Sequence, residues 1–317
     1  MGVVSLFSGA GGLDLGLVQA GHVVTWANDF DADAVRTYGR NIGPHAVLGD
    51  ICSIPSTDIP ACDAVVGGFP CQGFSQANRL RFADDPRNRL YREFLRVVRD
   101  KQPLFFLAEN VRGILSLAGG TAIRQIEDDF RAVGYRVSKR LFNMADHGVP
   151  QRRMRVIIAG TRHDLPSSCD FEFPAATHAS PSLATLLGMP PWVTVGEAVA
   201  RFPEPGETHE MHNHVHSLYK VTNRNFTGHR ATDGSKPSPT ILARGNGKGG
   251  VCAIQHPQNH RRMSVREQAA IQCFPDDFFF EGGLNSAYRQ VGNAVPVVFG
   301  RQLGEALHRS ATLREAA

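Results

Sequence analysis

The sequence has no long hydrophobic run, and it does not open with the residue pattern expected of a secretion signal. Its longest apolar stretches, such as Leu104–Ala108, are far shorter than the roughly 20 residues that a helix needs to cross a bilayer. No basic segment opens the chain as in a signal peptide, and Leu6 stands where a myristoylation signal has Ser or Thr. We therefore expect a cytoplasmic protein that does not engage a membrane.

The sequence also lacks the cysteine spacings of disulfide frameworks and zinc sites. Its six cysteines form no Cys-x-x-Cys pair, so we expect reduced thiols, five of which serve packing. The sixth, Cys71, follows an apolar run on a turn rich in Gly and Pro, where it can face a cleft instead of the core. His209, His212, His214 and His216 have no cysteine nearby and match no common zinc set, so no metal site is predicted.

Charge is distributed unevenly along the chain. Between Met211 and Arg262, eight Lys and Arg residues accompany a single acid, Asp233, which gives this segment a charge of +7. Since the whole chain carries +4, the rest of it carries −3. A basic segment on a mildly acidic body is typical of a protein that binds a polyanion such as nucleic acid.

Apolar runs and helical periodicities alternate through the first half of the chain. Helices are predicted over Leu13–Ala20, from a cap at Asp31 to about Asn41, and around two apolar stripes that include Phe94 and Ile126. Continuous apolar strands separated by helices predict an α/β fold with a doubly wound, mostly parallel sheet. The predicted strands are Val3–Phe7, Val23–Ala27, Ala46–Leu48, Ala64–Val66, Leu104–Ala108 and Val156–Ala159.

The composition changes after Thr161. Seven of the 19 prolines lie between Pro166 and Pro205, and the next stretch is rich in His, Asn, Gly and basic residues. Ser264 and Glu267 have the spacing of a capping box, which predicts a helix start, and a last helix is expected after Asn293. We therefore divide the chain into a first domain (1–172), a smaller loop-rich domain (173–283) and a C-terminal segment (284–317) that packs back on the first domain.

A glycine-rich loop and two acids indicate a nucleotide cofactor. Phe7–Gly12 follows the first predicted strand and opens the first helix, so its backbone can approach a ligand at the helix N-terminus. Asp29 ends the second strand 18 residues after Gly11, close to the ~20-residue offset of a carboxylate that binds a ribose hydroxyl, and Asp50 ends the third. Glycine spacing alone also fits a tight structural turn, but the two acids favour an adenosine-containing cofactor.

Reactive side chains are predicted at successive strand ends. Glu109 ends the fifth strand, and alternation along Gln151–Arg155 puts Arg153 and Arg155 on one side of the next. In open α/β sheets, ligands bind at these carboxyl ends. A thiol, an acid and two arginines beside a nucleotide site suit attack on an electron-poor ring, with Cys71 as the nucleophile and Glu109 as the donor to a ring nitrogen.

With these motifs in this order, nearly the whole chain resembles the DNA (cytosine-5) methyltransferases. Pro70-Cys71-Gln72 is similar to the catalytic motif of that family, and Glu109-Asn110-Val111 is similar to its acid motif. Asp29 stands where many members have Glu, and Phe69 where some have a second Pro. The other matching segments are Phe7–Gly12, Asn28–Phe30, Gly49–Ile51, Gln151–Arg155, Pro239–Leu242, Arg261–Phe278 and Gln290–Pro296.

The resemblance implies roles for individual residues. Cys71, Glu109, Arg153 and Arg155 would be catalytic, and no metal ligand is implied. The residues implied to bind S-adenosylmethionine are Phe7, Gly9, Gly11, Asp29, Phe30, Asp50, Ile51, Pro70 and Asn293. The residues expected to contact DNA, from the loop after Cys71 and from the second domain, are Gln72, Ser75, Arg79, Arg81, Arg224, Arg230, Thr240, Arg244 and Lys248.

The implied reaction transfers a methyl group from S-adenosylmethionine to C5 of a cytosine in a specific double-stranded DNA sequence. The base would be flipped out of the duplex, because its C6 is out of reach in the stack. Cys71 would add to C6 while Glu109 stabilises N3 and Arg155 holds the O2 side. Arg153 would orient the site or reach the DNA backbone, and the loop Gln72–Asn88 would close over the base.

The same resemblance assigns catalysis and cofactor binding to a Rossmann-like first domain and target recognition to the second. It implies a nucleoid-associated monomer on double-stranded DNA, with a possible cognate restriction endonuclease that acts independently. Three alternatives stay open: a tRNA cytosine-5 methyltransferase, an NAD-dependent oxidoreductase and an idle DNA-binding subunit. The basic second domain and the absence of a Cys-Phe-Thr tripeptide favour DNA over RNA, while the other two alternatives leave Cys71 and Glu109 unused.

Overall fold

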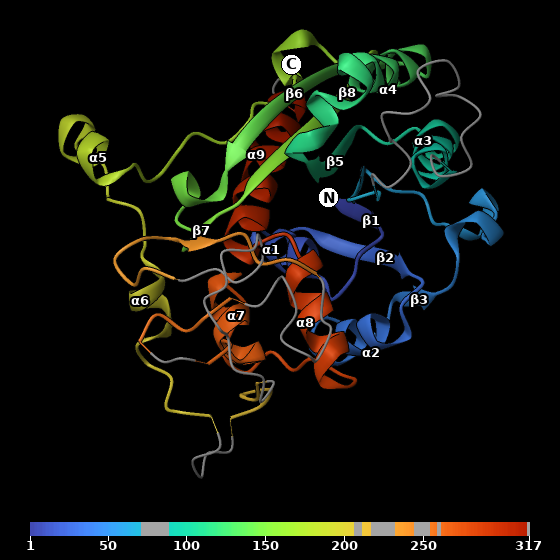
Figure 1. The fold of residues 1–317 in the computed structure, drawn as a ribbon. Helices are drawn as coiled ribbons and strands as arrows, with labels where there is room; N and C mark the ends of the chain where they lie inside the picture. Colours follow the sequence, from blue (N-terminus) through green and yellow to red (C-terminus); the bar gives the residue numbers. More distant parts are fainter. Residues whose placement is uncertain (71–88, 206–210, 217–231, 244–253, 259–260, 316–317) are drawn as a thin grey trace.

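The computed structural model describes residues 1–70, 89–205, 211–216, 232–243, 254–258 and 261–315. Its main sheet consists of β1 (Gly2–Leu6), β2 (Val23–Asp29), β3 (Ala46–Leu48), β4 (Ala64–Gly67), β5 (Phe105–Val111), β6 (Tyr135–Asn143) and β8 (Met154–Arg162). The strand order is β3-β2-β1-β4-β5-β8-β6 (Figure 1). Strands β1 to β5 pair in parallel, whereas β8 is antiparallel to both β5 and β6. The predicted α/β fold with a mostly parallel sheet is therefore confirmed.

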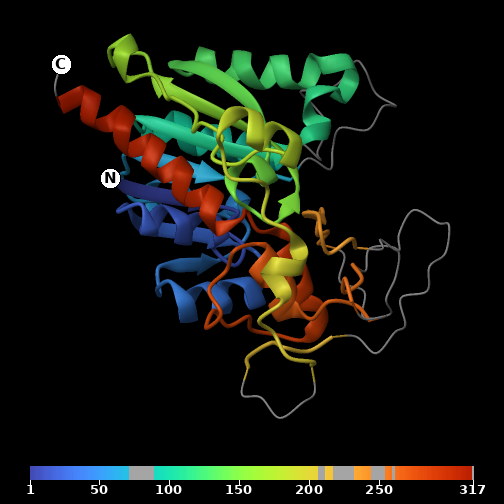
Figure 2. The same cartoon turned by 90° about the vertical axis from the view of Figure 1, so that its left-hand side faces the viewer.

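Helices cover both faces of this sheet. Leu13 and Leu17 pack with Phe299 on one face, and Phe94 packs with Phe130 on the other. Figure 2 shows the last helix, α9, running diagonally across the sheet. No helix in the described part of the chain is both long and apolar enough to cross a membrane. The helices are α1 (Gly12–Gln19), α2 (Ala32–Asn41), α3 (Arg89–Lys101), α4 (Thr121–Ala132), α5 (Pro181–Leu187), α6 (Val195–Val199), α7 (Val265–Ile271), α8 (Leu284–Asn293) and α9 (Val297–Glu315).

A third core lies outside the sheet and is built from α6, α7, α8 and the segments between them. Its members include Val195, Ile241, Met263, Phe274 and Tyr288. A two-stranded parallel sheet of β7 (Gln151–Arg152) and β9 (Ser238–Pro239) adjoins it. We call this part the small lobe, and the main sheet with α1–α4 and α9 the sheet lobe. Both views show the small lobe in the lower half of the molecule, at about the height of β2, β3 and α2 (Figures 1 and 2). Helix α8 thus belongs to the small lobe while α9 packs on α1, and the domain boundaries at 172 and 283 stay predictions.

Several local predictions are confirmed. All six predicted strands are present within one to a few residues of their expected bounds. The Asp31 carboxylate caps α2 by accepting hydrogen bonds from the backbone N–H groups of Asp33 and Ala34 at 3.0 and 3.4 Å. Ser264 and Glu267 form the predicted capping box at the start of α7. These features depend on neighbours only a few residues away, which is why the sequence alone predicts them.

Two strands differ from the prediction. Strand β5 continues to Val111, so Glu109 lies inside the ladder opposite Ile157 and does not end the strand. Strand β6 was not predicted, because it lies at the sheet edge and most of its side chains are at least partly exposed. An edge strand of this kind carries polar residues such as Lys139 and Arg140 and has no continuous apolar run.

Candidate active site

The candidate site is built at the carboxyl ends of the parallel strands. The loop after β1 begins with Phe7, whose φ of 56° is left-handed, and continues through Gly9 and Gly11 with φ of 55° and 86°. It leads directly into α1, so the N-terminal backbone of that helix lies beside the loop. Strands β3, β2, β1 and β4 are neighbours, and the predicted cofactor residues of the four strand ends therefore lie along one edge of the sheet.

Asp29 at the end of β2 fixes the shape of the loop. One carboxylate oxygen accepts a hydrogen bond from the Gly9 N–H at 2.8 Å, and the other accepts one from the Asp31 N–H at 2.9 Å. Burial raises the pKa of Asp29 above its usual value, while these N–H groups oppose that shift. The next residue, Phe30, is 73% exposed, which is unusual for an aromatic side chain and leaves its ring open to a stacking partner.

Asp50 and Ile51 continue the same edge after β3. The Asp50 carboxylate is exposed and accepts a hydrogen bond from the Cys52 N–H at 3.0 Å, which lowers its pKa, and Ile51 is buried. Sequence reasoning missed the residue that holds this segment: Arg96 of α3 donates to the carbonyls of Ile51 and Ile54 at 3.1 and 3.0 Å. A single arginine on an amphipathic helix carries no signal that predicts such a contact.

A buried acid behind the cofactor loop was also missed. Asp14 in the first turn of α1 is fully buried, accepts a hydrogen bond from Ser5 Oγ at 2.7 Å and lies beside the Tyr38 hydroxyl. Burial raises the pKa of Asp14 to about 6. Tyr38 in turn contacts His45 Nε2 at 3.0 Å. The signal in the sequence is an acid between Leu13 and Leu15 in a helix that is otherwise apolar up to Val18.

The acid motif and the segment that leads to Cys71 lie together. Glu109 forms an ion pair with Arg155 at 2.6 Å between Oε1 and Nε. A Cβ placed on Gly68 would be 3.1 Å from the other oxygen of Glu109, so the carboxylate lies against the backbone just before Pro70. Asn110 donates to the Phe69 carbonyl at 3.0 Å and so fixes the same backbone. Cys71 itself, and with it Gln72, Ser75, Arg79 and Arg81, lies outside the described residues.

Arg153 and Arg155 take different partners although they are two residues apart. Strand β7 ends before Arg153 and β8 begins after it, so Arg153 stands at a junction between two sheets. Its guanidinium is buried and donates to the carbonyls of Ile241 and Gly292, both at 3.1 Å. Burial and the neighbouring Arg155 lower the pKa of Arg153 to about 9. Of the two arginines, Arg155 forms the ion pair with Glu109, whereas Arg153 bonds to backbone carbonyls.

Two further predicted residues lie where these lobes meet. Asn293 is the last residue of α8 and is exposed, and the backbone after it packs against the start of α1, since a Cβ on Gly12 would clash with Val295. Thr240, predicted to contact DNA, donates from its hydroxyl to the Arg152 carbonyl at 2.7 Å. The predicted residue for the cofactor and the predicted residue for DNA are thus both held close to the 151–155 segment.

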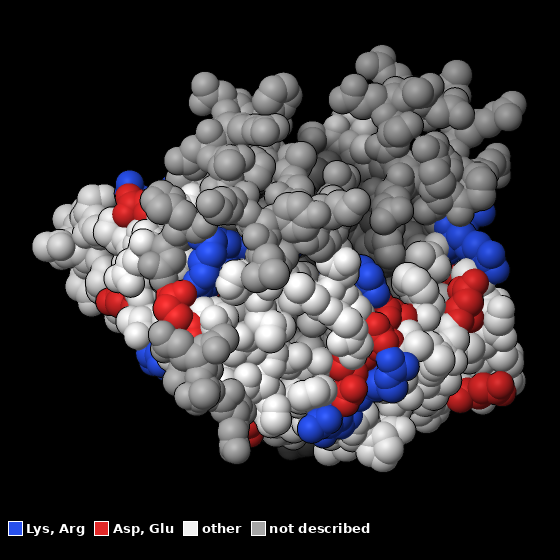
Figure 3. Space-filling view, turned by 60° about the horizontal axis from the view of Figure 1, so that its bottom comes forward, with Lys and Arg blue, Asp and Glu red and all other residues white. Residues whose placement is uncertain are grey.

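The described part of the basic segment is largely neutralised. Lys236 pairs with Asp233 at 2.7 Å, and Arg261 pairs with Glu267 at 2.7 Å and with Glu204 at 2.9 Å. On the face shown in Figure 3, Lys and Arg side chains likewise lie beside Asp and Glu. The other predicted DNA contacts, Arg224, Arg230, Arg244 and Lys248, lie outside the described residues, as does Lys220.

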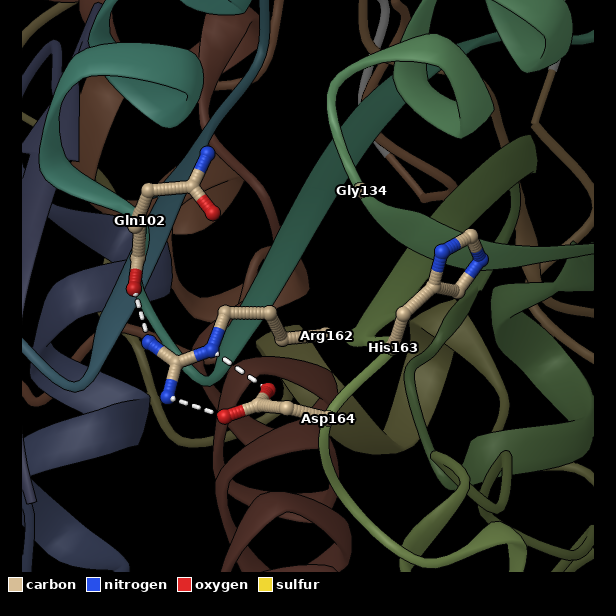
Figure 4. A pocket seen from close by; sticks show the side chains of 5 residues that line it. All are labelled: Gln102, Gly134, Arg162, His163 and Asp164. Carbon is tan, nitrogen blue, oxygen red and sulfur yellow. Dashed lines mark hydrogen bonds and ion pairs between the residues drawn. The ribbon is translucent and has the colours of Figure 1, made fainter.

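One surface hollow lies away from all of these residues. It has a volume of about 360 Å³ and is lined by Gln102, Gly134, Arg162, His163 and Asp164 (Figure 4). Arg162 ends β8, the strand that carries Arg155 at its other end, so the hollow lies at the opposite edge of the sheet. The guanidinium of Arg162 donates to the Asp164 carboxylate at 2.7 Å and to the Gln102 carbonyl. The hollow therefore forms no part of the candidate site.

Comparison with known proteins identifies the family of the chain. The model of the C-5 cytosine-specific DNA methylase family matches residues 1–309. The Type II methyltransferase M.NgoFVII of Neisseria gonorrhoeae is 39% identical over 93% of this chain and 83% of its own length. M.MthTI of Methanothermobacter thermautotrophicus, also a Type II methyltransferase, is 34% identical over 98% and 97%. The solved structure of the Entamoeba histolytica methyltransferase EhMeth shares the fold, with a TM-score of 0.72 at 17% identity over 98% of both chains.

The family match spans both lobes and includes every motif from the glycine loop to Asn293. It shows that the NAD-dependent oxidoreductase alternative is wrong. The chain belongs to the C-5 cytosine-specific DNA methylase family and is a DNA cytosine-5 methyltransferase.

Proposed function

We propose that this methyltransferase uses S-adenosylmethionine to methylate a cytosine that is flipped out of double-stranded DNA, with Cys71 as the covalent nucleophile. One observation carries the proposal: the Glu109–Arg155 ion pair lies against Gly68, three residues before Cys71, at the sheet edge that also carries the glycine loop. An acid, its arginine partner and the base of the nucleophile's loop thus converge on one edge of the sheet.

The described residues at this edge offer groups that suit S-adenosylmethionine, which supports the proposal. A Cβ placed on Gly9 would meet no atom within 4 Å, so the loop backbone is open to a ligand. The carboxylates of Asp29 and Asp50 stand at neighbouring strand ends and suit the ribose hydroxyls and the adenine amino group, and the exposed ring of Phe30 suits stacking. When bound, S-adenosylmethionine supplies the methyl group.

The protein's own residues would carry the other steps. The Cys71 thiolate would form a bond to C6 of the cytosine, and Glu109 would hold a proton at N3, so that C5 becomes nucleophilic. Loss of the C5 proton after methyl transfer would break the bond between Cys71 and C6. Arg155 would hold Glu109 in place and donate to the cytosine O2, in keeping with its 2.6 Å contact to that carboxylate. The buried position of Arg153 supports a role in orienting the site and not in reaching the DNA backbone.

The proposed partner is double-stranded DNA, bound by a monomer in the cytoplasm near the nucleoid. Since Lys236 and Arg261 are engaged by acids, the charge proposed for phosphates is that of the other predicted DNA contacts, namely Arg79, Arg81, Arg224, Arg230, Arg244 and Lys248. A cognate restriction endonuclease is part of the proposal because the relatives compared above are Type II methyltransferases.

The test is base-resolution mapping of 5-methylcytosine in DNA from a methylation-free host that expresses the protein, beside its Cys71→Ser variant. We expect methylation confined to one short sequence for the wild type and none for the variant. Purified Cys71→Ala should still bind S-adenosylmethionine while losing turnover. If a well-folded protein that binds S-adenosylmethionine leaves all DNA unmethylated, the proposal fails and RNA becomes the substrate to examine; methylation by Cys71→Ser would overturn the role of the nucleophile.

A further inference from the structure

A buried set of polar side chains holds the backbone of Pro239–Leu242, which we call the recognition segment. Ile241 lies two residues after the end of β9, and both of its backbone polar groups are bonded by side chains of Gln151 and Arg153. Its N–H donates to Gln151 Oε1 at 2.9 Å, and its carbonyl accepts from Arg153 Nη1 at 3.1 Å. Gln151 and Arg153 are essentially inaccessible to solvent. The segment predicted to read DNA is therefore fixed to the entry of the catalytic strand β8.

The same side chains also hold the backbone around Asn293. Arg153 Nη2 donates to the Gly292 carbonyl at 3.1 Å. Gln272, which accepts a hydrogen bond from Gln151 at 2.9 Å, donates to the Val291 carbonyl at 2.7 Å and to the Ala294 carbonyl at 3.2 Å. Three carbonyls on either side of the predicted cofactor residue are thus held by one connected set.

The two segments also touch through their backbones. A Cβ placed on Gly292 would be 2.6 Å from both Cα and N of Ala243 and 2.6 Å from the Leu242 carbonyl carbon. Real side chains do not approach backbone this closely, so only glycine lets the 242–243 backbone lie on the end of α8. Neither segment can shift without disturbing the other.

We propose that Arg153, Gln151 and Gln272 couple the recognition segment to the backbone of residues 291–294, which we call the cofactor segment. Binding of the cofactor and binding of DNA would then strengthen each other. Arg153 is in this view a positioning residue. A buried guanidinium N–H that loses its carbonyl partner is left as an unsatisfied donor, which is costly, so the two segments are expected to occupy their bound positions together. Linkage then requires the effect to be reciprocal. The DNA half of this inference rests on the proposed function; the link between the two segments does not.

The first experiment uses hydrogen exchange of the full chain with and without saturating S-adenosylhomocysteine. The amide of Ile241 reports directly on its bond to Gln151. We expect the ligand to slow exchange in residues 238–243 of the wild type by about fivefold or more, and we expect Arg153→Met to abolish this effect. Exchange that slows equally in Arg153→Met would overturn the coupling.

Arg266→Met is the matched control. Arg266 is as deeply buried as Arg153 and donates to the carbonyls of His212, Pro275 and Phe278, none of which belongs to the coupled segments. This variant should lose stability but keep the response of residues 238–243 to the ligand. If it loses that response as Arg153→Met does, general loosening explains both variants and the proposal is wrong.

Gly292→Ala tests the same link without removing a polar group, and it serves where Arg153→Met does not fold. At saturating S-adenosylhomocysteine it should lose the ligand-dependent protection of residues 238–243, and protection that persists in this variant would overturn the coupling.

The second experiment measures the Kd for a DNA duplex that carries the mapped methylation sequence, with and without S-adenosylhomocysteine. We expect the ligand to tighten wild-type DNA binding about tenfold, within the usual range of coupling between two sites, and to leave Arg153→Met unchanged. If no methylated sequence is found, the proposed function fails while the exchange experiment still decides the coupling. Equal tightening in both proteins would overturn the coupling alone.

Discussion

The sheet lobe and the small lobe hold their functional residues in place by different means. In the sheet lobe, the loop after β1, Asp29 and Asp50 follow strands whose register is fixed by parallel backbone ladders. In the small lobe, the described strand content is only β7 and β9, two residues each. There the backbone is held by buried polar side chains, as where Arg266 donates to three carbonyls.

This difference has a consequence for how each lobe tolerates change. A strand end stays in place when one side chain is altered, because the backbone ladder persists. A loop fixed by a buried charged or amide side chain loses its anchor with a single substitution and leaves unpaired polar groups behind. Substitutions of functional residues in the sheet lobe should therefore reduce activity with little loss of stability, whereas substitutions of the buried polar residues in the small lobe should reduce both.

The largest effect is expected from Glu109→Ala, which separates chemistry from stability in the sheet lobe. We expect kcat to fall about 10³-fold, the size of a lost general acid, with binding of S-adenosylmethionine retained. The matched control is Glu127→Ala, because Glu127 forms an ion pair with Lys139 at the same 2.6 Å but on the outer helix α4. Steady-state kinetics on DNA with the mapped sequence decides; similar losses of kcat in both variants would contradict the role of Glu109.

The next largest effect is expected at one of the two capping boxes of the small lobe. Glu267 is fully buried and pairs with Arg261 at 2.7 Å, whereas the capping box of Thr194 and Glu197 is exposed. We expect Glu267→Ala to lower the free energy of unfolding by about 3–5 kcal/mol, as for a broken buried ion pair. Glu197→Ala should cost only about 1 kcal/mol. Urea unfolding measures both free energies. Equal losses for Glu267→Ala and Glu197→Ala would show that the burial of Glu267 does not determine its contribution to stability.

A third test concerns the buried acid of the sheet lobe. Burial raises the pKa of Asp14 to about 6 in the folded protein, against 3.8 for an ordinary Asp. The folded state therefore binds more protons than the unfolded state between these values, and stability falls as the pH rises through this window. The loss approaches about 3 kcal/mol above pH 7.

Asp14→Asn keeps an acceptor for Ser5 and removes the titration. Its free energy of unfolding should exceed that of the wild type at pH 8 and should vary less between pH 4 and pH 7. Asp58→Asn, at an exposed carboxylate, controls for the removal of one charge. Thermal unfolding across this pH range gives the answer, and parallel curves for the wild type and Asp14→Asn would contradict the assignment.

The smallest effect is expected from Phe30→Ala. Stacking on an exposed ring is worth about 1–3 kcal/mol, so the Kd for S-adenosylmethionine should rise at least about fivefold. Stability should hardly change, because the ring is 73% exposed and packs little. Leu186→Ala, at a residue 78% exposed on α5, should change neither quantity. Calorimetric titration distinguishes the two variants, and an unchanged Kd for Phe30→Ala would remove this residue from the cofactor site.

The sequence predicts what depends on near neighbours and misses what depends on distant ones. The strands, the Asp31 cap and the box at Ser264 follow from periodicity and short spacings. The partners of Arg153 lie 88 and 139 residues away, so no local pattern identifies them. Strand β6 was missed because an edge strand does not need an apolar run.

The packing of α9 on α1 has a consequence for how the protein folds during its synthesis on the ribosome. Val3, Leu13 and Leu17 emerge early, but their core partners Phe299 and Leu303 emerge nearly 300 residues later. At about 5–20 residues per second, this apolar surface waits roughly 15–60 s for its cover. Nascent chains that lack residues 297–315 should therefore depend on chaperones, and a premature stop before Val297 should yield an insoluble product and not a smaller enzyme.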